Sequence, residues 1–340
     1  MKRSVILMGG LALAMAWAMA PSLAAEPEQA APAATPGSEQ PAQPAPPAAT
    51  PEATPEGPEY SALGAKACMR CHDEKEAYPV LSILKTPHAQ IADPRTPFAQ
   101  HQCESCHGAS PQHMKVPAAG QLRAPPTVDY GPRQPSPAAV QNKQCLSCHE
   151  NKLRMHWQGS QHETRGVGCV SCHQMHTQHD KVRAKATQPA VCFTCHKQQR
   201  AEAYMPSHHP IVQGKIVCSN CHNPHGSSGP KMLAKNTVNE TCYTCHAEKR
   251  GPFLWEHPPA REDCRNCHVP HGSVQPRLLR ARAPYLCQEC HAEDGHPDDV
   301  RSGTGIPPNP GAQQLVLKAC LNCHVNVHGS NHPSGPRFAR

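Results

Sequence analysis

The pattern Cys-x-x-Cys-His occurs ten times in this chain of 340 residues and accounts for all 20 cysteines. Two thiols at this spacing can form thioether bonds to one porphyrin, and the histidine that follows is then placed beneath the iron as its proximal ligand. Ten covalently attached haem c groups, with their iron, are therefore predicted. The attachment cysteines are Cys68, Cys71, Cys103, Cys106, Cys145, Cys148, Cys169, Cys172, Cys192, Cys195, Cys218, Cys221, Cys242, Cys245, Cys264, Cys267, Cys287, Cys290, Cys320 and Cys323. The proximal histidines are His72, His107, His149, His173, His196, His222, His246, His268, His291 and His324.

Three other uses of paired cysteines fit this pattern less well. Zinc ribbons contain Cys-x-x-Cys, but they do not require a histidine directly after every second cysteine. Disulfides form in oxidising compartments, but they would not impose one spacing ten times. A thioredoxin-like motif occurs once per domain, between a strand and a helix. Haem attachment is the remaining interpretation.

The histidines outside the motifs form a repeat of their own. Taken two motifs at a time, the chain consists of five units, and each contains a motif, a spacer with a histidine, a second motif and a histidine shortly after it. We call these the first to fifth units, and the two extra histidines the spacer and the trailing histidine. Because a porphyrin supplies four of six iron ligands, ten such histidines predict bis-histidine coordination of every haem. The predicted distal ligands are His88, His113, His162, His176, His209, His225, His257, His271, His296 and His328.

Several choices among histidines stay open at this stage. The spacing does not assign each distal histidine to an iron. His209 is preferred over His208 because it precedes a proline, as His257 and His296 do, and His328 competes with His332. Methionine can replace histidine as an axial ligand, but the ten methionines show no matching periodicity. The unused histidines, expected at the surface or in packing, are His101, His156, His179, His208 and His332.

The composition predicts that haem, rather than side chains, forms the interior. Four Phe, six Tyr and three Trp cannot build ordinary cores for 340 residues. The predicted fold class is therefore a multihaem cytochrome c, with mostly irregular loops and short α-helices around an elongated row of ten c-type haems and negligible β-structure. Two cysteine-free, Pro- and Gly-containing stretches, residues 114–143 and 292–319, are expected to be surface loops.

The N-terminal residues predict export. Residues 1–25 read as a cleaved signal peptide, with Lys2 and Arg3 before an apolar stretch and small residues at a cleavage site. Residues 26–58 are rich in Pro and Ala and should form a disordered tether. Residues 59–340 would then be the decahaem domain, located in the periplasm. The formal net charge of +7 is interpreted as a counter-charge to haem propionates, so nucleic acid is not an expected partner.

Longer segments carry a family resemblance. TCYTCHAEKRGPFLWEHPP (241–259), CQECHAEDGH (287–296) and CLNCHVNVHGSNHPSGP (320–336), with the ten motifs, resemble the MtrA/DmsE family of periplasmic decahaem cytochromes, which includes MtoA- and PioA-like members. The resemblance spans about residues 60–340. It implies an elongated row of bis-histidine haems in two pentahaem halves, roughly 59–200 and 201–340.

The same resemblance implies a function at the outer membrane. Family members lie inside an outer-membrane β-barrel porin and conduct electrons between the periplasm and the cell exterior, in metal reduction or Fe(II) oxidation. Extracellular multihaem cytochromes, minerals or metal ions, and periplasmic or inner-membrane cytochromes are the implied electron-transfer partners. The long tether resembles that of members linked to Fe(II) oxidation, so the direction of electron flow stays open.

Two alternatives remain. The first is a soluble periplasmic carrier that serves a terminal reductase such as a dimethyl sulfoxide reductase. The second is a multihaem reductase of nitrogen or sulfur oxyanions, which needs an open iron position. Because every motif has a candidate second ligand, an electron carrier is favoured over an enzyme.

Overall fold

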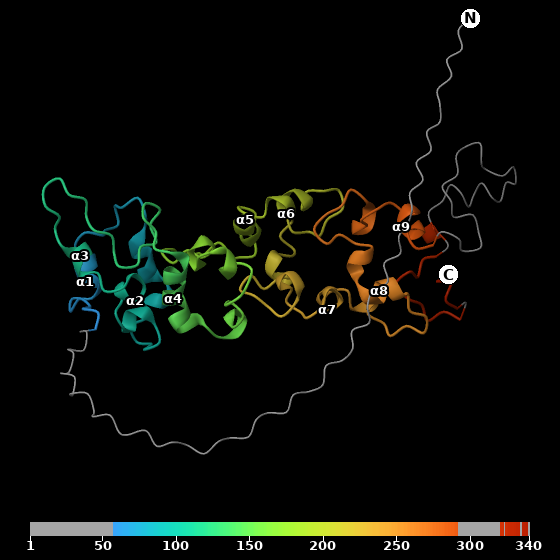
Figure 1. The fold of residues 1–340 in the computed structure, drawn as a ribbon, viewed down its shortest axis with the longest axis horizontal. Helices are drawn as coiled ribbons and strands as arrows, with labels where there is room; N and C mark the ends of the chain where they lie inside the picture. Colours follow the sequence, from blue (N-terminus) through green and yellow to red (C-terminus); the bar gives the residue numbers. More distant parts are fainter. Residues whose placement is uncertain (1–56, 292–319, 323, 334, 339–340) are drawn as a thin grey trace, which may run out of the picture. The chain divides into compact units, whose positions relative to one another are not determined.

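The computed structural model describes residues 57–291, 320–322, 324–333 and 335–338 (Figure 1). The chain divides into two parts, Met1–Pro55 and Glu56–Arg340, and the described residues all lie in the second. The predicted signal peptide, the tether up to residue 56 and the stretch 292–319 lie outside the described residues. The predicted domain limits therefore stay predictions.

Short helices joined by irregular segments make up the described residues. The α-helices are α1 (Ala65–Cys68), α2 (Glu104–His107), α3 (Pro111–Met114), α4 (Ala138–His149), α5 (Gln188–Cys192), α6 (Lys197–Glu202), α7 (Val238–Tyr243), α8 (Pro258–Glu262) and α9 (Tyr285–Gln288). The 3₁₀ helices are η1 (Val80–Lys85), η2 (Pro87–Ala89), η3 (Pro97–Ala99), η4 (Lys152–Arg154), η5 (Glu163–Arg165), η6 (Cys169–Ser171), η7 (Cys218–Asn220), η8 (Pro230–Met232), η9 (Ala247–Lys249), η10 (Cys264–Asn266), η11 (Pro276–Leu278) and η12 (Cys320–Asn322). Among the described helices, none combines the length and hydropathy that a membrane span requires.

Each motif folds as about one helical turn. The proximal histidine donates its backbone N–H to the carbonyl of the first cysteine, at 3.0 Å for His72 and 2.9 Å for His173. Residues three and four apart share one side of a helical turn. The turn therefore brings both thiols and the imidazole of a motif to the same side of the backbone.

The interior of the described part contains few apolar side chains. Its buried hydrophobic residues are Ala65, Phe98, Val128, Trp157, Ala203, Val217 and Leu286. No large side chain among the described residues is fully buried. Together with the absence of named strands in these residues, this confirms the predicted fold class: short helices and loops without a side-chain core of ordinary size.

The third and fourth units repeat the same local structure. His222 bridges Leu233 through the backbone, and His268 bridges Leu279 in the same antiparallel manner. In Figure 1 the colours succeed one another along the second part, so units adjacent in sequence are also adjacent in space.

One loop prediction needs a correction, because the stretch 114–143 is irregular only up to α4, which begins at Ala138. Pro137 immediately precedes this helix, a position where proline does not interrupt helical hydrogen bonds.

Candidate haem-attachment sites

The two motifs of each unit meet at their first cysteines. Within the described residues the cysteine thiols form no disulfide. Instead, the Cys68 thiol contacts the Cys103 thiol, and this hydrogen bond lowers the pKa of Cys68 to about 7. The same contact raises the pKa of Cys103. The equivalent thiol pairs are Cys145–Cys169, Cys192–Cys218, Cys242–Cys264 and Cys287–Cys320.

Between units, the motifs meet at their second cysteines. Burial raises the pKa of Cys106, and the neighbouring Cys148 thiolate of the second unit raises it further. The other neighbouring pairs are Cys172–Cys195, Cys221–Cys245 and Cys267–Cys290. Thiol contacts within units and electrostatic interactions between units therefore alternate along the chain and link the ten motifs in sequence order.

Nine predicted distal histidines lie opposite nine proximal histidines. An imidazole nitrogen binds a first-row metal ion at about 2 Å, and the ring centre lies about 1 Å behind it, so two rings on opposite sides of one iron have centres about 6 Å apart. The ring centres are 6.1 Å apart for His72–His113, His88–His149, His162–His196, His173–His225, His257–His291 and His268–His328, 6.2 Å for His222–His271, and 6.3 Å for His107–His176 and His209–His246. These spacings fit a haem iron between each pair.

Most of these pairs join histidines of different units. The proximal histidine of the first motif in a unit faces the spacer histidine of the preceding unit, as His149 faces His88. The proximal histidine of the second motif faces the trailing histidine of the next unit, as His107 faces His176. His72 has no preceding unit and faces His113 of its own.

Second-sphere contacts orient the rings. Metal-bound histidines usually donate their second ring N–H to a carbonyl or carboxylate. The Nδ1 atom of His162 lies 2.7 Å from the Pro224 carbonyl, and that of His209 lies 2.6 Å from the Pro270 carbonyl. The ring then presents Nε2 to the space between the paired histidines. Each accepting proline directly precedes a trailing histidine, so the same contact positions both distal ligands at a boundary between units.

Burial keeps several of these imidazoles in the neutral form that metal ligation requires. Burial lowers the pKa of His107, His222 and His328 below its usual range. The effect is largest at His225, where burial and the nearby His173 lower the pKa to about 4.

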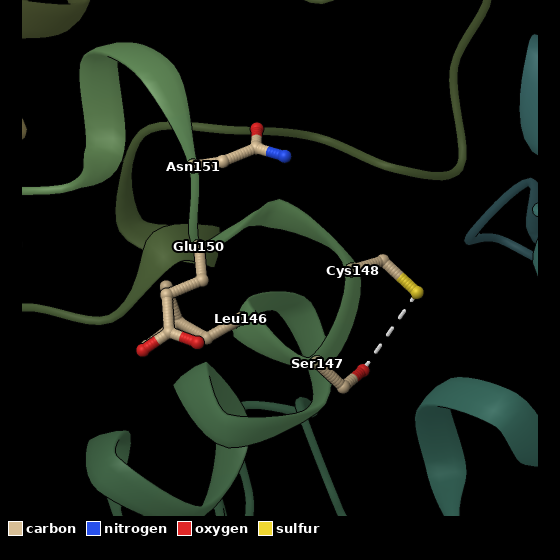
Figure 2. Close-up of a pocket in the computed structure, with 5 residues that line it drawn as sticks. All are labelled: Leu146, Ser147, Cys148, Glu150 and Asn151. Atoms are coloured by element: carbon tan, nitrogen blue, oxygen red, sulfur yellow. Dashed lines mark hydrogen bonds between the residues drawn. The ribbon is translucent and has the colours of Figure 1, made fainter.

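A cavity of about 350 Å³ lies at the end of α4, beside the third motif. Its lining residues are Leu146, Ser147, Cys148, Glu150 and Asn151 (Figure 2). Figure 2 shows the Ser147 hydroxyl directed at the Cys148 sulfur, and the oxygen and sulfur atoms are 3.9 Å apart. The Glu150 side chain lies away from this sulfur. The Cys148 thiol is thus exposed and accessible for attachment of a haem.

Buried asparagines that the sequence analysis did not single out hold the two motifs of a unit together. The Asn142 side chain accepts the backbone N–H of Cys169 at 2.7 Å, and Asn239 accepts that of Cys264 at 2.7 Å. Both asparagines stand three residues before the first cysteine of their unit. That shared position was the available sequence signal.

The remaining histidines occupy other environments. The His101 ring stacks on Tyr60 with centres 3.7 Å apart. His208, the alternative to His209, directs Nδ1 at the Met205 carbonyl at 2.5 Å and Nε2 at Gln213. His296 lies outside the described residues, so its role as a distal ligand stays a prediction.

The described fold and these sites define a multihaem c-type cytochrome, in which short peptide segments hold several covalently attached haems. Multiheme cytochrome MtrA of Shewanella baltica is 44% identical to the chain over 283 residues, which is 83% of each protein. The chain belongs to the MtrA family of multihaem cytochromes and is an electron carrier.

Other matches agree with this class. A model of the doubled CXXCH motif matches residues 208–251 and 257–296. A model of NrfB-like c-type cytochromes matches residues 103–187. The cytochrome c-type protein NrfB of Escherichia coli O6:H1 is 28% identical over 153 residues, covering 43% of this chain and 73% of the relative. The NrfB protein of Haemophilus influenzae is 30% identical over 105 residues, covering 29% of this chain and 45% of the relative.

Proposed function

We propose that the chain holds ten haem c groups, each ligated by two histidines, and that consecutive haems form one continuous path for electrons. The iron of each haem accepts and releases one electron when bound. The ten motifs hold the haems through their thiols, and the nine facing histidine pairs complete the axial ligation at nine of them. For the tenth, elimination leaves His296 as the partner of His324.

The observation that carries this proposal is the alternating contact between motifs. Cys68 contacts Cys103 within the first unit, and Cys106 lies near Cys148 across the boundary to the second unit. The same alternation continues to Cys320. Thioether bonds at these cysteines would hold one edge of each haem, so the edges of successive haems would then lie beside one another.

We further propose that the protein works in the periplasm as part of a conduit through an outer-membrane β-barrel porin. The predicted signal peptide, the MtrA family membership and the order of the motifs along the chain support this role. The hydrocarbon layer is about 30 Å thick, so electrons need intermediate centres to cross it. The polar lumen of a large barrel suits a chain whose mean hydropathy is −0.61. Its redox partners would be extracellular cytochromes, minerals or metal ions on one side and periplasmic or inner-membrane cytochromes on the other.

A soluble carrier function is the second candidate, and the match of residues 103–187 to NrfB-like c-type cytochromes supports electron transfer without naming a membrane partner. Both candidates use the same row of haems and differ in the partner. Bis-histidine ligation would leave no iron position open for a substrate in either case. The protein would therefore transfer electrons without catalysing a substrate reaction at its own haems.

Two measurements test the proposal. A pyridine haemochrome assay on the purified protein should give ten haems per polypeptide, and its absorption spectrum should lack a high-spin band. Fewer haems, or rapid CO binding by the reduced protein, would contradict the ligation scheme.

The conduit is tested by its partner. Detergent-solubilised outer membranes should yield the cytochrome together with a large barrel protein. The isolated complex in liposomes should then exchange electrons between an external iron species and an enclosed redox dye. Recovery only in the soluble periplasmic fraction, with no exchange across liposomes, would favour the soluble carrier instead.

A further inference from the structure

The second motifs of the units differ in what accepts the Nδ1–H of the proximal histidine. In the third and fourth units the acceptor is a backbone carbonyl, Lys231 for His222 at 3.1 Å and Arg277 for His268 at 2.8 Å. In the fifth unit it is again a carbonyl, that of Arg337, 2.6 Å from His324.

The first unit also uses a carbonyl at this position. The His107 ring lies 3.2 Å from the Val128 oxygen. In the second unit, however, the acceptor is a carboxylate, because Nδ1 of His173 lies 2.6 Å from Oδ2 of Asp180. The second unit thus places a negative charge where the other four place a neutral dipole.

The surroundings of Asp180 strengthen the electrostatic effect of its carboxylate on His173. Its side chain is only 10% exposed. Its other oxygen accepts the backbone N–H groups of Gln174 and Val182, both at 3.4 Å. Among the described residues, the ion-pair partner of Asp180 is His173. A partly buried charge is screened less by solvent than an exposed one.

We propose that Asp180 is a tuning residue that lowers the reduction potential of the haem attached through Cys169 and Cys172. A carboxylate that accepts the Nδ1–H makes the imidazole a stronger electron donor. A stronger axial donor stabilises Fe(III) relative to Fe(II), and second-sphere hydrogen bonding is one of the means by which proteins set haem potentials. The inference rests on the proposed ligation of this iron by His173 and His225.

Two other carboxylates should act in the same direction with smaller effects. Glu202 lies 3.2 Å from His271 and is 20% exposed, and Glu76 lies 3.0 Å from His72 and is 35% exposed. Their greater exposure lets solvent screen the charge. The expected order of effect on the respective haems is Asp180, then Glu202, then Glu76.

The test is a spectroelectrochemical titration of the full haem-loaded protein carrying Asp180→Asn. Asparagine keeps the shape and a carbonyl acceptor but removes the charge. One-tenth of the absorbance amplitude should move to a more positive potential, while all haems stay low-spin. Asp180→Glu should restore a curve near that of the wild type.

Glu248→Gln is the matched control. Glu248 lies 3.8 Å from Nδ1 of His246, and its side chain is 61% exposed, so its removal should leave the titration unchanged. Superimposable curves for Asp180→Asn and the wild type would overturn the inference. A new high-spin signal in Asp180→Asn would also overturn it, because Asp180 would then hold the ligand in place rather than tune the iron. A high-spin haem already present in the wild type would instead contradict the proposed bis-histidine ligation.

Discussion

The N-terminal end of the haem domain and its interior complete their sites in different ways. At the N-terminal end, His72 faces the trailing histidine His113 of the same unit. In the interior, His222 of the third unit faces His271 of the fourth, and His246 of the fourth faces His209 of the third. Neighbouring interior units therefore exchange one distal histidine in each direction, whereas an end unit keeps one for itself.

This difference shows how a repeated sequence forms one continuous assembly. In the proposed ligation scheme an interior unit cannot complete either of its own sites, because both distal histidines come from its neighbours. Each boundary between interior units is instead crossed by two histidine pairs, and each pair contains one histidine from either unit. Ligation should therefore couple the units in folding, since a metal-dependent fold gains its stability where the ligands meet.

The largest expected effect comes from disturbing an interior boundary. A Cβ atom at Gly272 would overlap the backbone carbonyl of Glu202 in the preceding unit. We expect Gly272→Ala to push His271 away from His222 and to displace the Pro270 carbonyl from His209. Up to two of the ten predicted haems should then lose low-spin coordination, which is measured as a new high-spin band and as CO binding after reduction.

Gly214→Ala is the control for this variant. Gly214 has a φ of +70°, which disfavours alanine, but open space surrounds its Cβ position. Backbone strain alone should leave all haems low-spin. Equal spectra for Gly272→Ala and the wild type would show that the boundary adapts, and that the two shared sites do not depend on this close approach.

The second prediction asks whether the C-terminal end mirrors the N-terminal one. His324 has no following unit, and elimination assigns it His296 of its own unit. His296→Ala should therefore convert one haem in ten to a high-spin form that binds CO, while His332→Ala should not. If only His332→Ala produced a high-spin haem, His332 rather than His296 would be the ligand opposite His324, and the two ends of the domain would differ.

Much of the site was predictable from the sequence because haem attachment is encoded locally. Cys-x-x-Cys-His forms its own helical turn, so the motifs fix which residues meet a haem. The spacer and trailing histidines could be recognised by their period, and His209 by its following proline. Their pairing could not be predicted, because the spacing assigns no distal histidine to a particular iron, and only the folded chain shows that histidines of adjacent units lie face to face. The asparagine contacts and the start of α4 depend on tertiary packing that no local pattern reveals.

A third, smaller effect should follow from removing the hydrogen bonds that join the two motifs of one unit. Asn239 accepts the Cys264 N–H and donates to the carbonyls of Ala260 and Arg261. Asn239→Leu keeps the branching at Cγ but leaves these buried groups unpaired, at a cost of about 1–3 kcal/mol. The midpoint of thermal unfolding of the haem-loaded protein should fall.

Asn142→Leu in the second unit should lower the midpoint to a similar extent, because Asn142 makes the equivalent bond to Cys169. Asn236→Leu serves as the control, since the Asn236 side chain is exposed and accepts a hydrogen bond from the Ser228 hydroxyl rather than from a motif. An unchanged midpoint for both buried variants would mean that haem attachment alone holds the two motifs of a unit together.

The smallest expected effect concerns the backbone that supplies a carbonyl to the proximal histidine in the fourth unit. Arg277 has a φ of +61°, and its oxygen accepts the Nδ1–H of His268. The left-handed conformation costs a non-glycine residue about 1–2 kcal/mol, whereas glycine in a fixed conformation loses about 0.5–1 kcal/mol of additional entropy. Arg277→Gly should thus change stability by no more than about 1 kcal/mol and leave the haem spectrum unaltered. Arg277→Val should lower the midpoint of unfolding, because a β-branched residue resists positive φ. If Arg277→Gly proves as damaging as Arg277→Val, the arginine side chain, rather than its carbonyl, supports this site.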